Sequence, residues 1–146
     1  MKPIRLEIDG INSYASKQVI DFDRLTSRGI FGIFGKTGSG KSTILDAMTL
    51  ALYGNIARGS KEFINSNRDK AIVSYTFELG LGQDRVRYMV SRRFKKSERS
   101  GKTSATSDYV RLMSMGQDGN YEVLADKVGE VNKQIKAILG LEEGDF

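Results

Sequence analysis

The feature that most constrains this chain is a glycine-rich segment, residues 35–42, which matches the pattern G-x-x-x-x-G-K-[ST] in full. This pattern forms a phosphate-binding loop when it follows a buried strand and opens a helix. An apolar run at 29–34 precedes it, and apolar residues at helical spacing follow it as far as Tyr53, just before Gly54. A chance glycine-rich turn before a helix is the alternative, and the two flanks argue against it. The sequence therefore predicts a strand, loop and helix that bind a nucleoside triphosphate.

Each residue type in the segment has a chemical role. Glycines allow positive φ angles, so that successive backbone N–H groups can point at the same phosphate oxygens, and the following helix directs its positive end there. Lys41 is expected to reach the β- and γ-phosphates as the catalytic residue, and the Ser42 hydroxyl to coordinate Mg²⁺. The predicted nucleotide-binding residues of this region are Gly35, Lys36, Thr37, Gly38, Ser39, Gly40, Lys41, Ser42 and Thr43.

Composition narrows the remaining chemistry. The length of 146 residues and a hydrophobic content of 39% suit a single domain with a core. The chain has no Cys and no His, which removes disulfides, thiolate metal sites and the commonest acid–base group. No stretch approaches the ~20 apolar residues of a membrane span. The first residues also lack the apolar region of a signal peptide, so we expect a cytoplasmic protein with no membrane contact.

Positive charge is concentrated in one segment. The chain has a formal net charge of +5, and residues 85–102 contain eight basic residues against one acidic residue. Clustered Lys and Arg neutralise DNA phosphates without reading sequence, whereas a solvated edge strand protected by charge is the competing interpretation. The predicted DNA-contact residues are Arg85, Arg87, Arg92, Arg93, Lys95 and Lys96.

The rest of the chain is predicted to form short strands and one further helix. Alternation of apolar and polar residues predicts strands on both sides of the loop, while 95–107 is expected to be a flexible stretch. The last helix is expected to have Asp126 as its N-cap and Gly140 as its stop. The predicted strands besides the one at 29–34 are 4–8, 18–22, 73–79, 86–90, 109–115 and 121–124.

Two strands before the loop favour a particular α/β architecture. In simple nucleotide kinases the loop usually follows the first strand, so the upstream β-structure points instead to an ABC-type ATPase, by analogy of fold. The expected fold is a P-loop NTPase whose N-terminal lobe carries an antiparallel β-subdomain. It is expected to be a partial domain, because no apolar run ends in the carboxylate that hydrolysis requires, and no Ser-Gly-Gly-type signature is present.

A GTPase interpretation has weak support. Residues 126–129 spell D-x-x-G, and Asn132-Lys133 begins the pattern N-K-x-D. The position that should hold the Asp of the second pattern is not acidic, and both motifs fall within one predicted helix. A charged helix face explains them better.

The chain resembles the N-terminal lobe of the SbcC family, the SMC-like ABC ATPases that act in DNA repair with a nuclease subunit. The first half of the chain is the specific part of the resemblance. The residues that carry it are Ile11 to Tyr14, Ile20 to Phe22, Ile30 to Ala47, Leu50 to Gly54, Arg58, Tyr88 to Phe94 and Ile138 to Leu141.

This resemblance implies ATP and Mg²⁺ as cofactors and residues 1–146 as the N-terminal half of an ATPase head. The implied partners are the C-terminal half and coiled coil of the same protein, a second copy of the head, an SbcD-like nuclease subunit and double-stranded DNA. The magnesium carboxylate, the signature motif and a Gln that helps to hold Mg²⁺ are then expected downstream. We therefore expect ATPase activity in the full-length protein and negligible activity from this segment alone.

Three further residues are considered in the light of the resemblance. Relatives often carry an Arg where this chain has Asn12, so Asn12 and Ser13 are expected to line the nucleotide as neutral hydrogen-bonding groups; an ordinary turn is an equally good explanation. Asp46 lies one helical turn after Ser42 and could support the magnesium site or be an exposed helix residue.

Other function classes remain as alternatives. An ABC transporter ATPase or a small P-loop kinase would need a transmembrane partner or an acceptor site, and the sequence signals neither. A DNA-binding module that holds phosphate without turnover is the non-enzymatic alternative.

Overall fold

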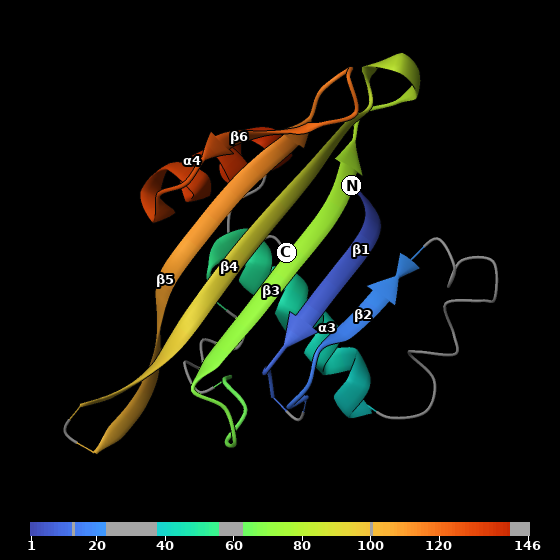
Figure 1. Cartoon of the computed structure of the whole chain (residues 1–146). Helices are drawn as coiled ribbons and strands as arrows, with labels where there is room; N and C mark the ends of the chain where they lie inside the picture. Colours follow the sequence, from blue (N-terminus) through green and yellow to red (C-terminus); the bar gives the residue numbers. More distant parts are fainter. Residues whose placement is uncertain (13, 23–37, 56–62, 100, 141–146) are drawn as a thin grey trace.

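The computed structural model describes residues 1–12, 14–22, 38–55, 63–99 and 101–140 (Figure 1). The strand predicted at 29–34 and the first part of the glycine-rich loop lie outside these described residues. Within them, the chain forms one antiparallel sheet with two α-helices packed against it.

The sheet contains six described strands in the order β2-β1-β3-β4-β5-β6, and every neighbouring pair is antiparallel. A short 3-10 helix, η1 (Gly82–Asp84), separates β3 from β4. This arrangement confirms the predicted antiparallel β-subdomain. The strands are β1 (Lys2–Asp9), β2 (Gln18–Asp21), β3 (Lys70–Leu79), β4 (Val86–Arg99), β5 (Lys102–Met115) and β6 (Tyr121–Ala125).

One face of the sheet is covered by helices α3 (Gly38–Tyr53) and α4 (Val128–Leu139). Alternate residues of neighbouring strands meet on that face, as in the register Leu6↔Tyr75 and Val73↔Arg92. The covered face is rich in aromatic rings, and Phe77 stacks against its neighbours at ring-centroid distances of 5.2 and 5.7 Å. Burial of this apolar surface is the main force that holds the helices to the sheet.

Helix α3 ends at Tyr53, where the sequence predicts its C-terminal end. Most of its apolar residues recur at helical spacing and are buried, including Ala47, Leu50 and Ala51, whereas Leu45 is exposed. Gly54 then adopts a φ of 80°, and its N–H donates to the carbonyl of Leu50 at 2.9 Å. Glycine takes this left-handed conformation without steric cost, so it ends the helix.

The segment expected to be flexible is instead a long β-hairpin. Strands β4 and β5 remain paired as far as Arg99↔Lys102, and Gly101 adopts a φ of 74° in the turn. Both arms extend beyond the other strands at the lower left of Figure 1. Backbone pairing extends where side-chain alternation is weak, because the ladder bonds do not depend on residue type.

Helix α4 ends as predicted but begins one residue later than expected. Gly140 has a φ of 65°, and its N–H donates to the Lys136 carbonyl at 2.9 Å. The N-cap is Lys127 rather than Asp126, and its side chain makes no capping hydrogen bond. The pattern of the buried residues Val131 and Ile135 therefore places the helix better than the capping signal did. Neither α-helix in the described part of the chain is long and apolar enough to cross a membrane.

Candidate nucleotide-binding site

The glycine-rich motif leads into the start of helix α3. Residues 38–42 form the first turn and the beginning of the second, so the backbone N–H groups at this end have no partners within the helix. Such a helix N-terminus attracts anions. Of the predicted nucleotide-binding residues, Gly35, Lys36, Thr37 and Ser13 lie outside the described residues.

Two predicted site residues that are far apart in the sequence come together beside this helix end. The Asn12 amide nitrogen lies 3.5 Å from the Thr43 hydroxyl oxygen, a weak hydrogen bond. Thr43 follows the motif directly and is buried, while Asn12 belongs to the loop after β1. The loop after β1 therefore lies against the second turn of the helix that the motif opens.

The loop that carries Asn12 is held by the segment before β3. Asn12 has a φ of 52°, and its N–H donates to the Phe63 carbonyl at 2.7 Å. The Asn65 side-chain amide donates to the Asn12 carbonyl at 2.7 Å, while the Asn65 N–H donates to the Gly10 carbonyl at 2.7 Å. These bonds satisfy the backbone of a loop in an uncommon conformation.

Arg68 provides a second support for the same loop. Its guanidinium donates to the Asp9 carboxylate at 2.7 Å and to the Ala15 carbonyl at 2.5 Å. The sequence around Asn65 predicts only turn material, and neither supporting residue was predicted from it. For Asn65, the sequence Asn-Ser-Asn at 65–67 was a signal of a turn. The Asn67 N–H does donate to the Asn65 side chain at 2.9 Å in a local turn.

Gly10 offers a direct test of this loop. A Cβ atom at Gly10 would lie 2.6 Å from the Lys70 carbonyl oxygen, and its φ of +79° is strained for any L-residue. We expect Gly10→Ala to destabilise the protein by about 2 to 4 kcal/mol, since strain and a backbone clash both contribute. Thermal unfolding would measure the loss, with Gly119→Ala as the control, because Gly119 also has positive φ but its Cβ would meet nothing within 4 Å. An equal effect of both substitutions would show that strain alone, and not the contact with β3, is responsible.

Asp46 is buried, so the interpretation of this residue as an exposed helix position is wrong. Only 6% of its surface is accessible, one helical turn after Ser42. A carboxylate in this position is compatible with an outer-shell interaction that orients the expected magnesium ligand, Ser42. Support of the magnesium site by Asp46 therefore stays a prediction.

Most of the predicted DNA-contact residues are engaged in ion pairs or in the sheet. Arg85 and Arg87 both pair with Glu78, at 3.7 and 3.1 Å. Lys95 is exposed on β4 and Lys96 is half-buried. The charges of Arg85 and Arg87, at the start of β4, are therefore partly neutralised, whereas Lys95 and Lys96 lie nearer the β4–β5 turn.

Arg92 is not available for contact with DNA. Its side chain has 0% exposure, because it shares the covered face of β4 with the buried residues Val90 and Phe94. Its inclusion among the DNA-contact residues is therefore wrong. The alternation that places Arg85 and Arg87 on one face of the strand assigns Arg92 to the other face, and this signal could have excluded it.

The open face of the sheet carries a further basic cluster. Arg93 donates to the Asp108 carboxylate at 3.0 Å, which raises the pKa of Arg93 and lowers the pKa of Asp108. The guanidinium carbons of Arg93 and Arg111 lie 5.8 and 5.4 Å from the centre of the Tyr109 ring. Cation–π contacts of this kind hold both cations beside one ring. Arg111 was not identified from the sequence.

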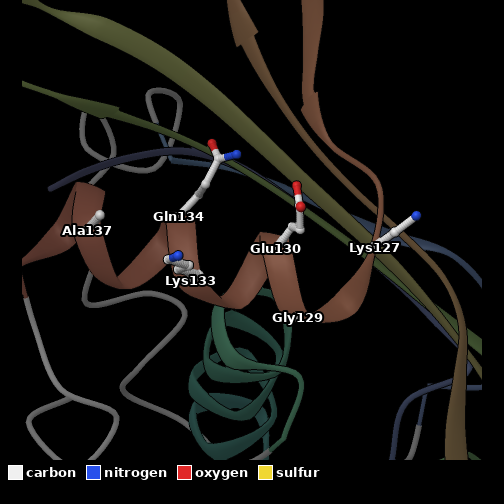
Figure 2. Close-up of a pocket in the computed structure, with 6 residues that line it drawn as sticks. All are labelled: Lys127, Gly129, Glu130, Lys133, Gln134 and Ala137. Atoms are coloured by element: carbon white, nitrogen blue, oxygen red, sulfur yellow. The ribbon is translucent and has the colours of Figure 1, made fainter.

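A pocket lies along α4, and none of its described lining residues is a predicted nucleotide-binding residue (Figure 2). The Gln134 side chain there donates to the Leu124 carbonyl at 3.2 Å, which ties the helix to β6. The described lining of the pocket therefore comes from α4 and the residue before it, and not from α3. Its described lining consists of Lys127, Gly129, Glu130, Lys133, Gln134 and Ala137.

The chain is similar to a known domain family and to curated proteins. A family model described as an AAA domain matches residues 5–146. Two curated relatives, the SbcC subunits of the SbcCD nuclease, are 44% identical over 146 residues in Clostridium acetobutylicum and 43% identical over 149 residues in Bacillus subtilis. Both alignments cover 100% of this chain but only 12% and 13% of the relatives. The chain therefore spans about an eighth of the length of these relatives.

Proposed function

Because the chain belongs to the AAA domain family, we propose that it forms the ATP-binding N-terminal lobe of a cytoplasmic, SMC-like DNA-repair ATPase. The observation that carries the proposal is the position of the glycine-rich motif, which opens α3 next to the loop that holds Asn12. A phosphate group at that helix end would meet unpaired backbone N–H groups. Lys41 would contact the β- and γ-phosphates, and Ser42 would hold Mg²⁺.

The direct test is Mg²⁺-dependent binding of ATP to the longer protein that contains this lobe. Titration calorimetry with and without Mg²⁺ should show tighter binding with the ion, since Mg²⁺ bridges the phosphates to the Ser42 hydroxyl. GTP should be tested beside ATP, because the motif recognises phosphates and not the base. If the protein binds neither ATP nor GTP, the proposal is refuted.

In this proposal the lobe contributes half of an active site. Two heads would hold ATP between them, and binding or hydrolysis would change the geometry of a partner nuclease at DNA ends. The relatives are named as subunits of the SbcCD nuclease, and these names support the partnership with a nuclease. An ABC transporter ATPase or a small kinase has no comparable support.

A lobe that holds half of the site should bind nucleotide without turning it over. We predict that purified residues 1–146 hydrolyse ATP at a rate indistinguishable from a no-enzyme control, because the water-positioning and signature groups are supplied elsewhere. Release of inorganic phosphate is the measurement. A rate that is well above the control, and that Lys41→Ala removes, would mean that the segment contains a complete site.

The exposed part of the β4–β5 hairpin is proposed to contact the DNA backbone. Once Arg92 is excluded, the candidate cations on the part of β4 that leads to the tip are Arg93, which pairs with Asp108, and Lys95 and Lys96. The competing interpretation is a charged edge that only prevents aggregation. The two interpretations differ in the salt dependence of duplex binding.

We predict that changing Arg93, Lys95 and Lys96 to Ala together weakens duplex binding and reduces the slope of log K against log salt by about 0.9 for each phosphate that the variant no longer contacts. Fluorescence anisotropy at several salt concentrations would measure the slope. A control with Arg5 and Lys17 changed to Ala removes exposed positive charge from β1 and from the turn before β2. If both variants alter the slope equally, the hairpin has no special role.

A further inference from the structure

The largest fully buried side chain of the described core is a cation, Arg92. Its Nε donates to the Ala51 carbonyl at 2.7 Å, and its Nη2 donates to the Leu52 carbonyl at 3.0 Å and to the Asn132 side-chain oxygen at 2.8 Å. One guanidinium from β4 therefore contacts the last turn of α3 and the middle of α4. Three separate elements meet at this single group.

The charge of Arg92 is balanced by a helix end. Among the described residues, no carboxylate pairs with it, and its acceptors are two helix carbonyls and an amide. Burial lowers the pKa of Arg92 to about 10, which reflects the cost of removing the cation from water. The carbonyl end of a helix carries partial negative charge, and the planar guanidinium can donate to several acceptors at once.

The space around the guanidinium is also shaped for it. A Cβ atom at Gly54 would lie 3.1 Å from Nη1 of Arg92, so the glycine that ends α3 leaves room for the group. Nη1 is buried, and it has no hydrogen-bond partner among the described residues. A Lys at this position would keep the charge but could not hold the three acceptors in the same geometry.

The two elements joined by Arg92 each lead to a proposed binding site. Helix α3 begins at the phosphate loop and ends at the carbonyls that Arg92 contacts. Strand β4 continues beyond Arg92 into the basic hairpin. A rigid helix transmits a shift at one end to the other, and the contacts of Arg92 would pass that shift to β4.

We propose that Arg92 is a positioning residue that fixes the C-terminal end of the phosphate-loop helix to β4 and α4, and thereby links nucleotide binding to DNA binding by the hairpin. This inference rests on the proposed function, because it requires both ligands. The link is reciprocal: ATP changes the affinity for DNA by the same factor as DNA changes the affinity for ATP.

The experiment measures the linkage in the full-length protein with its nuclease subunit. The dissociation constant for duplex DNA is determined without nucleotide and with a non-hydrolysable ATP analogue and Mg²⁺, and the ratio of the two is compared between variants. For the wild type, we expect the two dissociation constants for DNA to differ by about fivefold or more. For Arg92→Lys, we expect them to agree within about twofold. Each ligand should still bind to the variant when tested alone.

Two further variants separate positioning from stability. Val110→Ala removes buried methyl groups from the residue opposite Arg92 in the ladder, so it destabilises the same region but keeps the side chain of Arg92, and the ratio should stay at the wild-type value. Asn132→Ala keeps Arg92 but removes its side-chain partner on α4, and should give an intermediate ratio. It also decides the matter if Arg92→Lys does not fold.

Each outcome has a defined meaning. A wild-type ratio in Arg92→Lys, or in Asn132→Ala when Arg92→Lys does not fold, overturns the proposal. A loss of linkage in Val110→Ala equal to that in Arg92→Lys also overturns it, since general destabilisation then explains both. A ratio of one in the wild type, with both ligands bound, overturns the linkage but leaves the proposed function intact. Failure of the wild type to bind ATP refutes the proposed function itself.

Discussion

Replacing Lys41 by Ala should weaken ATP binding by about 10- to 150-fold, the effect of losing a charge-assisted contact of about 1.5 to 3 kcal/mol. The side chain is expected to meet the β- and γ-phosphates, where negative charge is greatest and where it develops further during phosphoryl transfer. Hydrolysis by the assembled protein should therefore fall by more than binding does. Titration with ATP and with ADP would measure the effect, and the loss should be larger for ATP.

The control for Lys41 is another lysine of the same lobe. Lys17 is exposed and pairs only weakly with Glu7, at 3.6 Å, before the edge strand β2. Lys17→Ala should leave ATP affinity unchanged, because surface ion pairs contribute little. If Lys41→Ala also leaves ATP affinity unchanged, the glycine-rich motif is not a phosphate loop and the proposed function fails.

Replacing Arg92 by Ala should lower the free energy of unfolding by about 3 to 5 kcal/mol, because it leaves a cavity and unpaired buried carbonyls at the end of α3. Arg92→Met should cost less than Arg92→Ala, since it fills the space with apolar atoms and removes the need to bury a charge. Chemical denaturation of the purified protein, followed by circular dichroism, would measure both.

Arg93 is the matched control for this prediction. It is the next residue along β4, faces the open side of the sheet and pairs with the exposed Asp108. Arg93→Ala should therefore change stability little. If Arg92→Ala has an effect as small as that of Arg93→Ala, the network at the end of α3 does not stabilise the fold.

Most strands and both described helices could be predicted from the sequence, because alternation and helical spacing record which face of an element is buried. Prediction was wrong for the stretch at 95–107, where β4 and β5 stay paired, and for the start of α4 at Lys127. In both places the outcome depends on backbone pairing or on packing against another element. A single-residue signal does not contain that information.

The candidate site, like the fold, could be predicted from the sequence only in part. The motif at 35–42 predicts phosphate binding, and helix α3 begins inside it, as the sequence requires. The supports of the Asn12 loop, Asn65 and Arg68, lie more than fifty residues away in the chain and were not predicted. Their roles depend on contacts between distant segments.

By itself, the sequence determined the phosphate-binding motif, since that chemistry depends on residue identity at short, fixed spacing. Tertiary structure decided which of the clustered cations can meet a ligand. Arg92 and Arg93 are adjacent in the sequence. Arg92 is buried against α3 and α4, whereas Arg93 faces the open side of the sheet. The physical reason is the two-residue period of a strand, which sends neighbouring side chains to opposite faces, and the packing of helices on only one of those faces.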